Sequence, residues 1–250
     1  MEEARLVAVV TGASRGLGAG MAAAWATRGI RVALCARTRP DAPERADSLT
    51  ASVDVTDAVS VDGFAGDVVE RFGPIDLWVN NAGILDPVGP LADADPGALS
   101  RNVDVNVLGV LNGSSAFARH VRARAGRGVL VNISSGGASR PYAGWAAYCG
   151  SKAAVEMITE VVAVEEREHG LRAHALAPGL VDTDMQALIR ATPIERFPDV
   201  ERFHEVHRRG SFNSAAWVAA FILEQLVRGP DAEFGADSGP AVRLRVPDEY

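Results

Sequence analysis

Short apolar segments alternate along the chain with longer segments that have helical patterns. Continuous apolar strands that alternate with helices are typical of a parallel sheet covered on both faces, so the predicted fold class is α/β. We expect one doubly wound domain over residues 1–250, with roughly seven strands. The predicted strands are Leu6–Val10, Arg31–Ala36, Ala51–Val53, Ile75–Asn80, Gly128–Ile133, Arg172–Ala177 and Ala241–Val246. The predicted helices are Gly16–Arg28, Asp57–Phe72, most of Pro96–Arg124, Ala146–His169 and Ser214–Arg228.

Residues 182–213 break this alternation. Pro193 and Pro198 stand there among scattered charges, with helical pieces near Met185–Arg190 and Val200–Arg208. The segment is too long for an ordinary connection, which favours a functional insertion on the substrate side over a plain surface loop.

A glycine-rich turn follows the first predicted strand and opens the first helix. Its glycines, Gly12, Gly16 and Gly18, let the backbone approach a pyrophosphate closely, and the helix N-terminus offers free N–H groups. Because the turn lies at the first strand-to-helix connection of a doubly wound sheet, it predicts dinucleotide binding in a Rossmann-type domain.

Tyr148 and Lys152 are four residues apart in a predicted helix, so their side chains share one face. The ammonium of Lys152 would lower the pKa of the tyrosine hydroxyl. Moving a phenol from a pKa of ~10 to near 7 takes about three units, and a nearby cation typically supplies ~1–3. A second positive charge, such as an oxidised nicotinamide, would help. Alone the pair is a weak signal, since two such residues often share a solvated face.

Five motifs together resemble the short-chain dehydrogenase/reductases, in order and over nearly the whole chain. They are the glycine turn, Asn80–Gly83, Asn106, Asn132–Ser135 and the Tyr148/Lys152 pair. The resemblance implies that Tyr148 gives its proton to a carbonyl oxygen as hydride arrives from C4 of the nicotinamide. Ser135, rather than its neighbour Ser134, would hydrogen-bond that oxygen. Lys152 would bind the nicotinamide ribose, and Asn106 would hold a water that links Lys152 to solvent.

The resemblance also implies the cofactor contacts. Asp54–Val55 matches the adenine-contacting pair, with helix capping as a second role for Asp54, and the segment from Pro178 to Thr183 would pass the nicotinamide carboxamide. The predicted cofactor-binding residues are Gly12, Ser14, Arg15, Gly16, Leu17, Gly18, Arg37, Asp54, Val55, Asn81, Ala82, Gly83, Tyr148, Lys152, Pro178, Gly179, Val181 and Thr183.

The end of the second predicted strand bears on the choice of cofactor. An acidic residue there selects NAD, but this chain has Cys35-Ala36-Arg37. Arg37, Arg39 and Arg15 could converge where a 2′-phosphate would lie, which favours NADPH over NADH; solvated surface arginines are the alternative. The segment 38–49 is short and holds Pro40 and Pro43, so the second crossover helix is expected to shrink to a turn.

Two stretches narrow the family. Pro141–Trp145 and Pro178–Gln186 resemble the sepiapterin reductase and benzil reductase branch, which reduces vicinal dicarbonyls with NADPH, and the tail from Asp248 is similar to bacterial benzil reductases. Pterin reductases of this branch carry an aspartate in the last strand that anchors the pterin ring, and Arg243 stands nearest that position here. A cationic residue would serve that contact badly, which favours an aromatic or other α-dicarbonyl over a pterin. Side chains expected to line an apolar cleft, with core packing as the alternative for each, are Tyr142, Trp145, Met185, Ile189 and Phe197.

Composition excludes some other classes. The net charge of −7 argues against a nucleic-acid surface, no apolar stretch is long enough for a membrane span, and no metal site is predicted. Met1–Arg5 does not read as a secretory signal, and Cys35 and Cys149 make no disulfide framework, so a cytoplasmic protein is expected. The resemblance implies a homodimer or homotetramer. Two other functions stay open: an NAD(P)-dependent dehydrogenase working towards the ketone, and a dinucleotide-binding regulator without turnover.

Overall fold

A computed structural model describes residues 6–44, 47–124, 126–228 and 243–249. It contains a seven-stranded sheet in which every neighbouring pair is parallel, in the order β3-β2-β1-β4-β5-β6-β7. The predicted single doubly wound domain is therefore confirmed. The strands are β1 Val7–Thr11, β2 Arg31–Ala36, β3 Ser48–Ser52, β4 Leu77–Asn80, β5 Gly128–Ile133, β6 Leu171–Ala177 and β7 Arg243–Arg245.

The helices follow the predicted pattern, with π-helical segments in two of them. The long predicted helix that starts at Pro96 contains a π-helical turn, η3, at Asp104–Leu108. The last predicted helix ends in a second π-helical segment, η6, at Ile222–Val227. The α-helices are α1 Gly16–Thr27, α2 Ala58–Phe72, α3 Pro96–Val103, α4 Gly109–Ala123, α5 Ala146–Glu166, α6 Asp184–Ala191, α7 Val200–Arg209 and α8 Ala215–Phe221.

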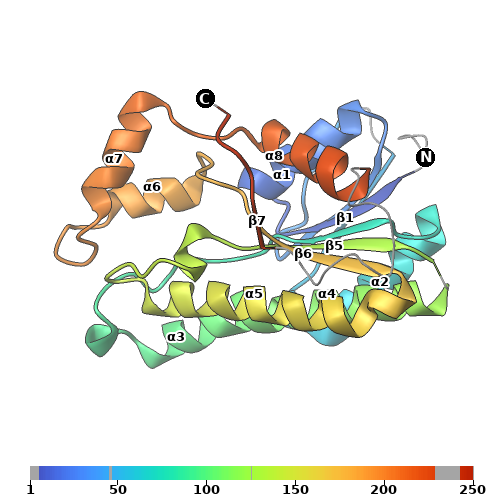
Figure 1. Ribbon diagram of the computed structural model, residues 1–250, viewed down its shortest axis with the longest axis horizontal. Coiled ribbons are helices and arrows are strands. Elements are labelled where there is room, and N and C mark those ends of the chain that lie inside the picture. The colour runs from blue at the N-terminus through green and yellow to red at the C-terminus, as the bar shows by residue number, and fades with distance from the viewer. Residues whose placement is uncertain (1–5, 45–46, 125, 229–242, 250) are drawn as a thin grey trace.

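Helices cover both faces of the sheet. In Figure 1, α1 and α8 lie on one face, and α4 and α5 lie on the other. The first face buries Trp25 of α1 against α8, and the indole donates to the carbonyl oxygen of Ala219 at 3.1 Å. The second face buries Trp78 and Phe117, whose ring centroids are 6.0 Å apart. Two cores thus fix the sheet, and the strands can be apolar on both sides as the sequence pattern predicts.

The strand order reverses between β1 and β4, which are neighbours in the sheet although β2 and β3 intervene in the sequence. In an open parallel sheet the crevice at such a point, beyond the carboxyl ends of the strands, is the usual ligand site. The connection from β2 to β3 has no helix in its described residues, as the two prolines predict. The wall of the crevice on the β2–β3 side is accordingly a loop.

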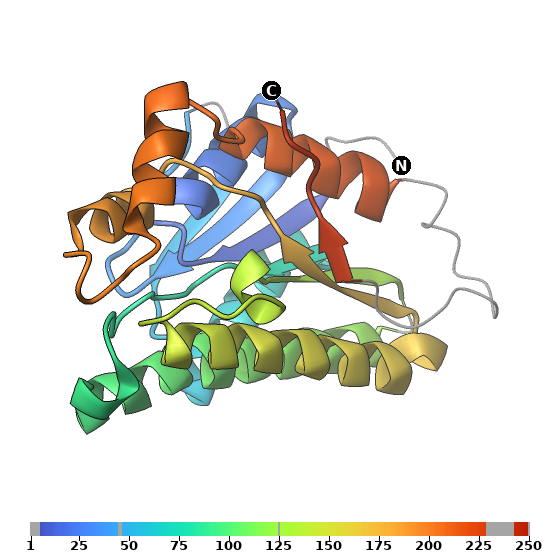
Figure 2. The same ribbon diagram turned by 60° about the vertical axis from the view of Figure 1, so that its left-hand side comes forward.

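The segment 182–213 carries α6 and α7, which stand beyond the end of the sheet (Figures 1 and 2). Its base is closed by Asn213, whose backbone N–H donates to the carbonyl oxygen of Leu180 at 2.8 Å. The Asn213 amide nitrogen also donates to the carbonyl oxygen of Pro178 at 3.0 Å, and its oxygen accepts from the backbone of Glu249 at 2.9 Å. One buried side chain therefore joins the loop after β6, the start of α8 and the C-terminal segment.

Candidate active site

A cavity of about 880 Å³ opens at the carboxyl ends of the central strands, within the range that suits small molecules and cofactors. Its walls come from the glycine turn, the ends of β4 and β5, the start of α5, the loop after β6, and helices α6 and α7. The predicted site residues that line it are Gly12, Ser14, Arg15, Gly16, Leu17, Arg37, Asp54, Val55, Asn81, Ala82, Gly83, Ser135, Tyr148, Pro178, Gly179, Val181 and Thr183. Gly18, Asn106 and Lys152 are buried and do not line it.

The glycine turn packs directly on the segment after β4. Gly12 has φ +65°, and a Cβ there would lie 2.6 Å from the Cα of Ala82, so the turn cannot accept a larger residue. A Cβ at Gly18 would lie 2.5 Å from the side-chain nitrogen of Asn81, which donates to the carbonyl oxygens of Thr11 and Gly12. Arg15, at the N-cap of α1, provides no side-chain cap. The turn thus presents backbone to the cavity at a helix N-terminus, which fits a pyrophosphate.

The three arginines do not converge as expected. Arg15 lines the cavity, but its Nε forms an ion pair with Asp184 of α6 at 3.0 Å. Arg39 donates to the hydroxyl of Thr50 in β3 at 2.9 Å and does not line the cavity. Arg37 is exposed at the cavity wall directly after β2. Arg37 is therefore the guanidinium best placed for a 2′-phosphate.

The two neighbouring serines face different surroundings. Ser135 lines the cavity with Tyr148, and its side chain acts to lower the tyrosine pKa. It also caps a short 3₁₀ turn, accepting from the backbone of Gly137 at 3.1 Å. The hydroxyl of Ser134 instead donates to the buried carboxylate of Glu156 at 2.8 Å. Of the two, Ser135 is thus the one that meets the tyrosine hydroxyl.

Burial governs the protonation of Tyr148 and Lys152. Desolvation raises the pKa of Tyr148 above its ordinary value of 10.0, against a smaller lowering by the hydrogen bond with Ser135. The ammonium of Lys152 lies 5.8 Å from the Tyr148 ring centroid and donates to the carbonyl oxygen of Ile133 at 2.7 Å. Burial lowers the pKa of Lys152 from 10.5 to about 8. The expected lowering of the tyrosine pKa by lysine is therefore wrong for this structure, because desolvation of the phenolate is the larger effect.

Asn106 lies in the π-helical turn η3 and is fully buried. Its side-chain oxygen accepts from the backbone N–H of Ile84 at 2.8 Å, and its nitrogen donates to the Ile84 carbonyl oxygen at 2.8 Å. The same nitrogen donates to the hydroxyl of Ser151 at 3.0 Å. This amide is committed to protein partners, so a water held by Asn106 would bind its main-chain carbonyl. The amide fixes the segment after β4 against α5.

Two expectations about the substrate side are wrong. Phe197 does not line the cavity; it is fully buried and stacks on Trp145 with ring centroids 4.5 Å apart. Arg243 also lies off the cavity, because Glu156 and Glu160 of α5 hold its guanidinium at 3.2 and 2.6 Å. Arg243 therefore does not disfavour a pterin substrate. Tyr142, Trp145, Met185 and Ile189 do line the cavity.

The cavity also contains polar residues that sequence reasoning missed. Arg140 follows β5, Gln186 belongs to α6 and Arg202 to α7, while Arg245 and Asp248 come from the C-terminal segment. No local pattern singles these residues out, because only long-range packing brings them to one wall.

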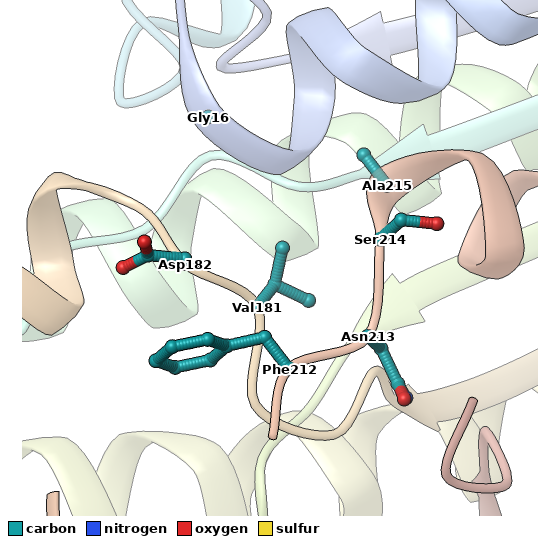
Figure 3. A pocket seen from close by; sticks show the side chains of 7 residues that line it. All are labelled: Gly16, Val181, Asp182, Phe212, Asn213, Ser214 and Ala215. Carbon is teal, nitrogen blue, oxygen red and sulfur yellow. The ribbon is translucent and has the colours of Figure 1, made fainter. Parts of the chain in front are cut away.

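Figure 3 shows a second cavity, of about 310 Å³. The segment with Val181 and Asp182 runs beside the segment from Phe212 to Ala215, and Gly16 and Val181 line both cavities. It contains neither Tyr148 nor Ser135, so the larger cavity is the candidate active site.

The described ranges also bear on metal sites, membrane spans and disulfides. No cluster of three or more His, Cys, Asp or Glu side chains there could hold a metal ion. No helix in the same ranges is long and apolar enough to cross a membrane. Cys35 and Cys149 are both free.

Comparison with known proteins agrees with this geometry. Residues 6–194 match the family model described as short chain dehydrogenase. Benzil reductase ((S)-benzoin forming) of Bacillus subtilis (strain 168) is 31% identical over 243 residues, which cover 89% of this chain and 94% of the relative. Cis-4-hydroxycyclohexanecarboxylate dehydrogenase of Sinomonas cyclohexanicum is 35% identical over 88% of this chain and 94% of its own. The crystal structure of the KRED1-Pglu enzyme superposes with a TM-score of 0.79 and 31% identity, over 90% of this chain and 95% of that one.

The chain belongs to the short-chain dehydrogenase/reductase family. It is accordingly an NAD(P)H-dependent oxidoreductase that acts on CH–OH and C=O groups.

Proposed function

We propose that the protein is an NADPH-dependent carbonyl reductase that acts on an α-dicarbonyl or aromatic ketone. The observation that carries this proposal is that Tyr148 and Ser135 both line a cavity that reaches the glycine turn. The hydroxyls of Tyr148 and Ser135 could both donate hydrogen bonds to the carbonyl oxygen of a substrate. Negative charge develops on that oxygen during reduction, and donors aimed at developing charge stabilise the transition state most effectively.

In this proposal a bound nicotinamide dinucleotide supplies the hydride at C4. Tyr148 holds the proton that the carbonyl oxygen receives, and its raised pKa keeps it protonated at neutral pH. Ser135 orients the same oxygen. Lys152, held by Ile133, would bind the nicotinamide ribose. The carbonyl gains one hydride and one proton, so the product is the alcohol.

NADPH is proposed over NADH because the strand end that would carry a selective acid carries Arg37 instead. The glycine turn would hold the pyrophosphate, and Asp54 and Val55 would lie at the adenine. The segment Pro178–Thr183 would face the nicotinamide. These roles fit the lining of the cavity.

The α-dicarbonyl substrate is proposed from the wall beside Tyr148. Tyr142 and Trp145 line the cavity there, with ring centroids 4.7 Å apart. The Bacillus subtilis relative is named for reducing benzil, a 1,2-diketone with two aromatic rings. The walls that Tyr142 and Trp145 form suit such rings.

We also propose that residues 182–213 act as the substrate-side insertion and that the protein is a cytoplasmic homo-oligomer. Apolar side chains are exposed on α4 and α5, which contact each other on one face of the sheet. An exposed apolar surface of this kind favours association. The exposed residues are Leu111, Met157, Val161 and Val164. Sedimentation analysis of Val164→Glu against the unaltered protein tests this surface, and an unchanged mass would refute it.

The test of the reaction is NADPH oxidation, followed by absorbance, with α-diketones, quinones, pterins and simple ketones. We expect the fastest turnover with aromatic α-diketones. Tight NADPH binding without oxidation by any compound would favour a regulator. Faster alcohol oxidation with NAD than ketone reduction with NADPH would favour a dehydrogenase.

A further inference from the structure

Five arginine side chains line the large cavity. Two of them are neutralised by neighbouring carboxylates: Arg15 by Asp184, and Arg245 by Asp248 at 3.2 Å. The other three are Arg37, Arg140 and Arg202. Arg37 is the guanidinium proposed for the 2′-phosphate of the cofactor. The remaining pair, Arg140 and Arg202, has no ion-pair partner in the described part of the chain, and the proposed reaction gives it no role.

Arg140 and Arg202 meet at one side chain, Tyr142. Arg202 donates from Nη1 to the Tyr142 hydroxyl at 3.1 Å. The guanidinium carbon of Arg140 lies 5.0 Å from the centroid of the Tyr142 ring. Arg140 comes from the segment after β5, whereas Arg202 comes from α7, so the fold brings two cations from distant segments to the same aromatic ring. Like charges repel, so a site of this kind is completed by an anion.

A continuous aromatic wall joins this pair to the proton donor. The ring centroids of Tyr148 and Trp145 are 5.6 Å apart, and those of Trp145 and Tyr142 are 4.7 Å apart. Phe197 stacks on Trp145 from behind and holds the wall in place. A substrate whose carbonyl meets Tyr148 and whose ring lies along Trp145 would extend towards Tyr142. Its far end would then reach the two guanidinium groups.

The acidic groups of the cavity do not cancel this charge locally. Asp184 and Asp248 are paired with the other two arginines, and the Asp54 carboxylate accepts hydrogen bonds from Thr56. Asp86 is the remaining carboxylate on the lining, and no guanidinium lies within 4.0 Å of it in the described residues. If Asp86 dominated the charge of the cavity, a cationic substrate would be preferred over an anionic one. A cationic compound therefore belongs in the test.

We propose that Arg140 and Arg202, held on Tyr142, form a binding site for an anionic group, a carboxylate above all, on the substrate. The preferred substrates would then be carbonyl compounds that carry a carboxylate about one aromatic ring away from the carbonyl. Arginine suits this role because its planar fork binds both carboxylate oxygens. This inference rests on the proposed function and names the substrate class of the same site.

Three matched diketones test the site: 4-carboxybenzil, its methyl ester, and a benzil with a 4-trimethylammonium group. With the unaltered protein we expect kcat/KM for the acid to exceed that for the ester by about tenfold, the effect of one charge-assisted hydrogen bond. The acid-to-ester ratio should fall towards one in Arg202→Gln and in Arg140→Gln. It should also fall with added salt, because the site is exposed.

Arg208→Gln is the matched control. Arg208 is on the same helix as Arg202 but pairs with Glu201 and Glu205 and does not line the cavity, so the ratio should stay unchanged. Equal kcat/KM for acid and ester in the unaltered protein, or a preference for the cationic compound, would overturn the anion site and leave the carbonyl reductase standing.

Calorimetric binding of 4-carboxybenzil to the NADP⁺-loaded protein separates the two proposals, because it requires no turnover. Binding that is tighter for the acid than for the ester and is lost in Arg202→Gln would support the anion site even if no compound were reduced. Equal binding of acid and ester would refute the site whatever the turnover.

Discussion

The ammonium nitrogen of Lys152 lies 2.7 Å from the carbonyl oxygen of Ile133, the last residue of β5. This carbonyl oxygen is an uncharged acceptor for the ammonium group of Lys152. Burial meanwhile lowers the pKa of the lysine to about 8. The folded protein therefore holds a charge at neutral pH in a place that disfavours it.

Lys152→Met should stabilise the fold while it removes activity. A pKa lowered from 10.5 to about 8 costs roughly 3 kcal/mol below pH 8, partly offset by the lost hydrogen bond, so the free energy of unfolding at pH 7 should rise by roughly 2 kcal/mol. The cost fades as the pH rises from about 8 towards 10.5, so the difference between the two proteins should shrink over that range. Urea unfolding at pH 7 and pH 10 measures it. A less stable variant at pH 7 would contradict this.

The same pKa sets a pH limit on catalysis. Lysine loses its charge above about pH 8 in the free protein, so kcat/KM for NADPH should decline there. Lys152→Arg retains its charge and should remove the decline, whatever its absolute rate. A profile that is flat to pH 10 in the unaltered protein would rule out this role.

Tyr148→Phe should reduce turnover by about 10²–10⁴-fold, the usual contribution of a general acid. NADPH affinity should change little, because the ring that packs edge-on against Trp145 is kept. Single-turnover absorbance and cofactor fluorescence separate the two effects. Substantial remaining activity would mean that another group donates the proton.

The neighbouring serines provide a matched pair. Ser135→Ala should lower kcat by about 10²–10³-fold, because it removes a donor from the carbonyl oxygen. Ser134→Ala removes the hydrogen bond to buried Glu156 and should instead lower stability by about 1 kcal/mol, with kcat nearly unchanged. Steady-state kinetics and thermal unfolding of both variants decide between them. The reverse pattern would assign the catalytic role to Ser134.

Arg37→Ala should raise the KM for NADPH by about tenfold or more and barely change the KM for NADH, because only NADPH carries the 2′-phosphate. Arg39→Ala is the control, since Arg39 bonds Thr50 outside the cavity and should affect both cofactors little. A similar effect of Arg37→Ala on both cofactors would sink the 2′-phosphate assignment.

Local patterns predicted the sheet because its central strands are apolar on both faces. β3 was the exception: it runs over Ser48–Ser52, earlier than the predicted Ala51–Val53, because this half-exposed edge strand mixes polar and apolar residues. The π-helical turn at Asn106 was also invisible, since its side chain bonds Ile84, which lies far away in the sequence.

Motif spacing predicted most of the residues that line the cavity, but it did not predict the direction in which the pKa of Tyr148 is shifted. The spacing of Tyr148 and Lys152 suggested a lowered tyrosine pKa, whereas burial raises it, and burial is a property of the whole fold. Arg243 illustrates the same limit. Counting along the last strand placed it near the substrate, but two acids of α5 hold it elsewhere.

The closure of the insertion by Asn213 has an evolutionary consequence. The two stems of residues 182–213 meet where Asn213 donates to Leu180, so the insertion leaves the rest of the fold and returns to it at one point. Exchange of the insertion between relatives would have to keep Asn213 with its acceptors at Pro178 and Leu180, and also the packing of Phe197 on Trp145. Libraries aimed at new substrates should diversify α6 and α7 and leave this anchor intact.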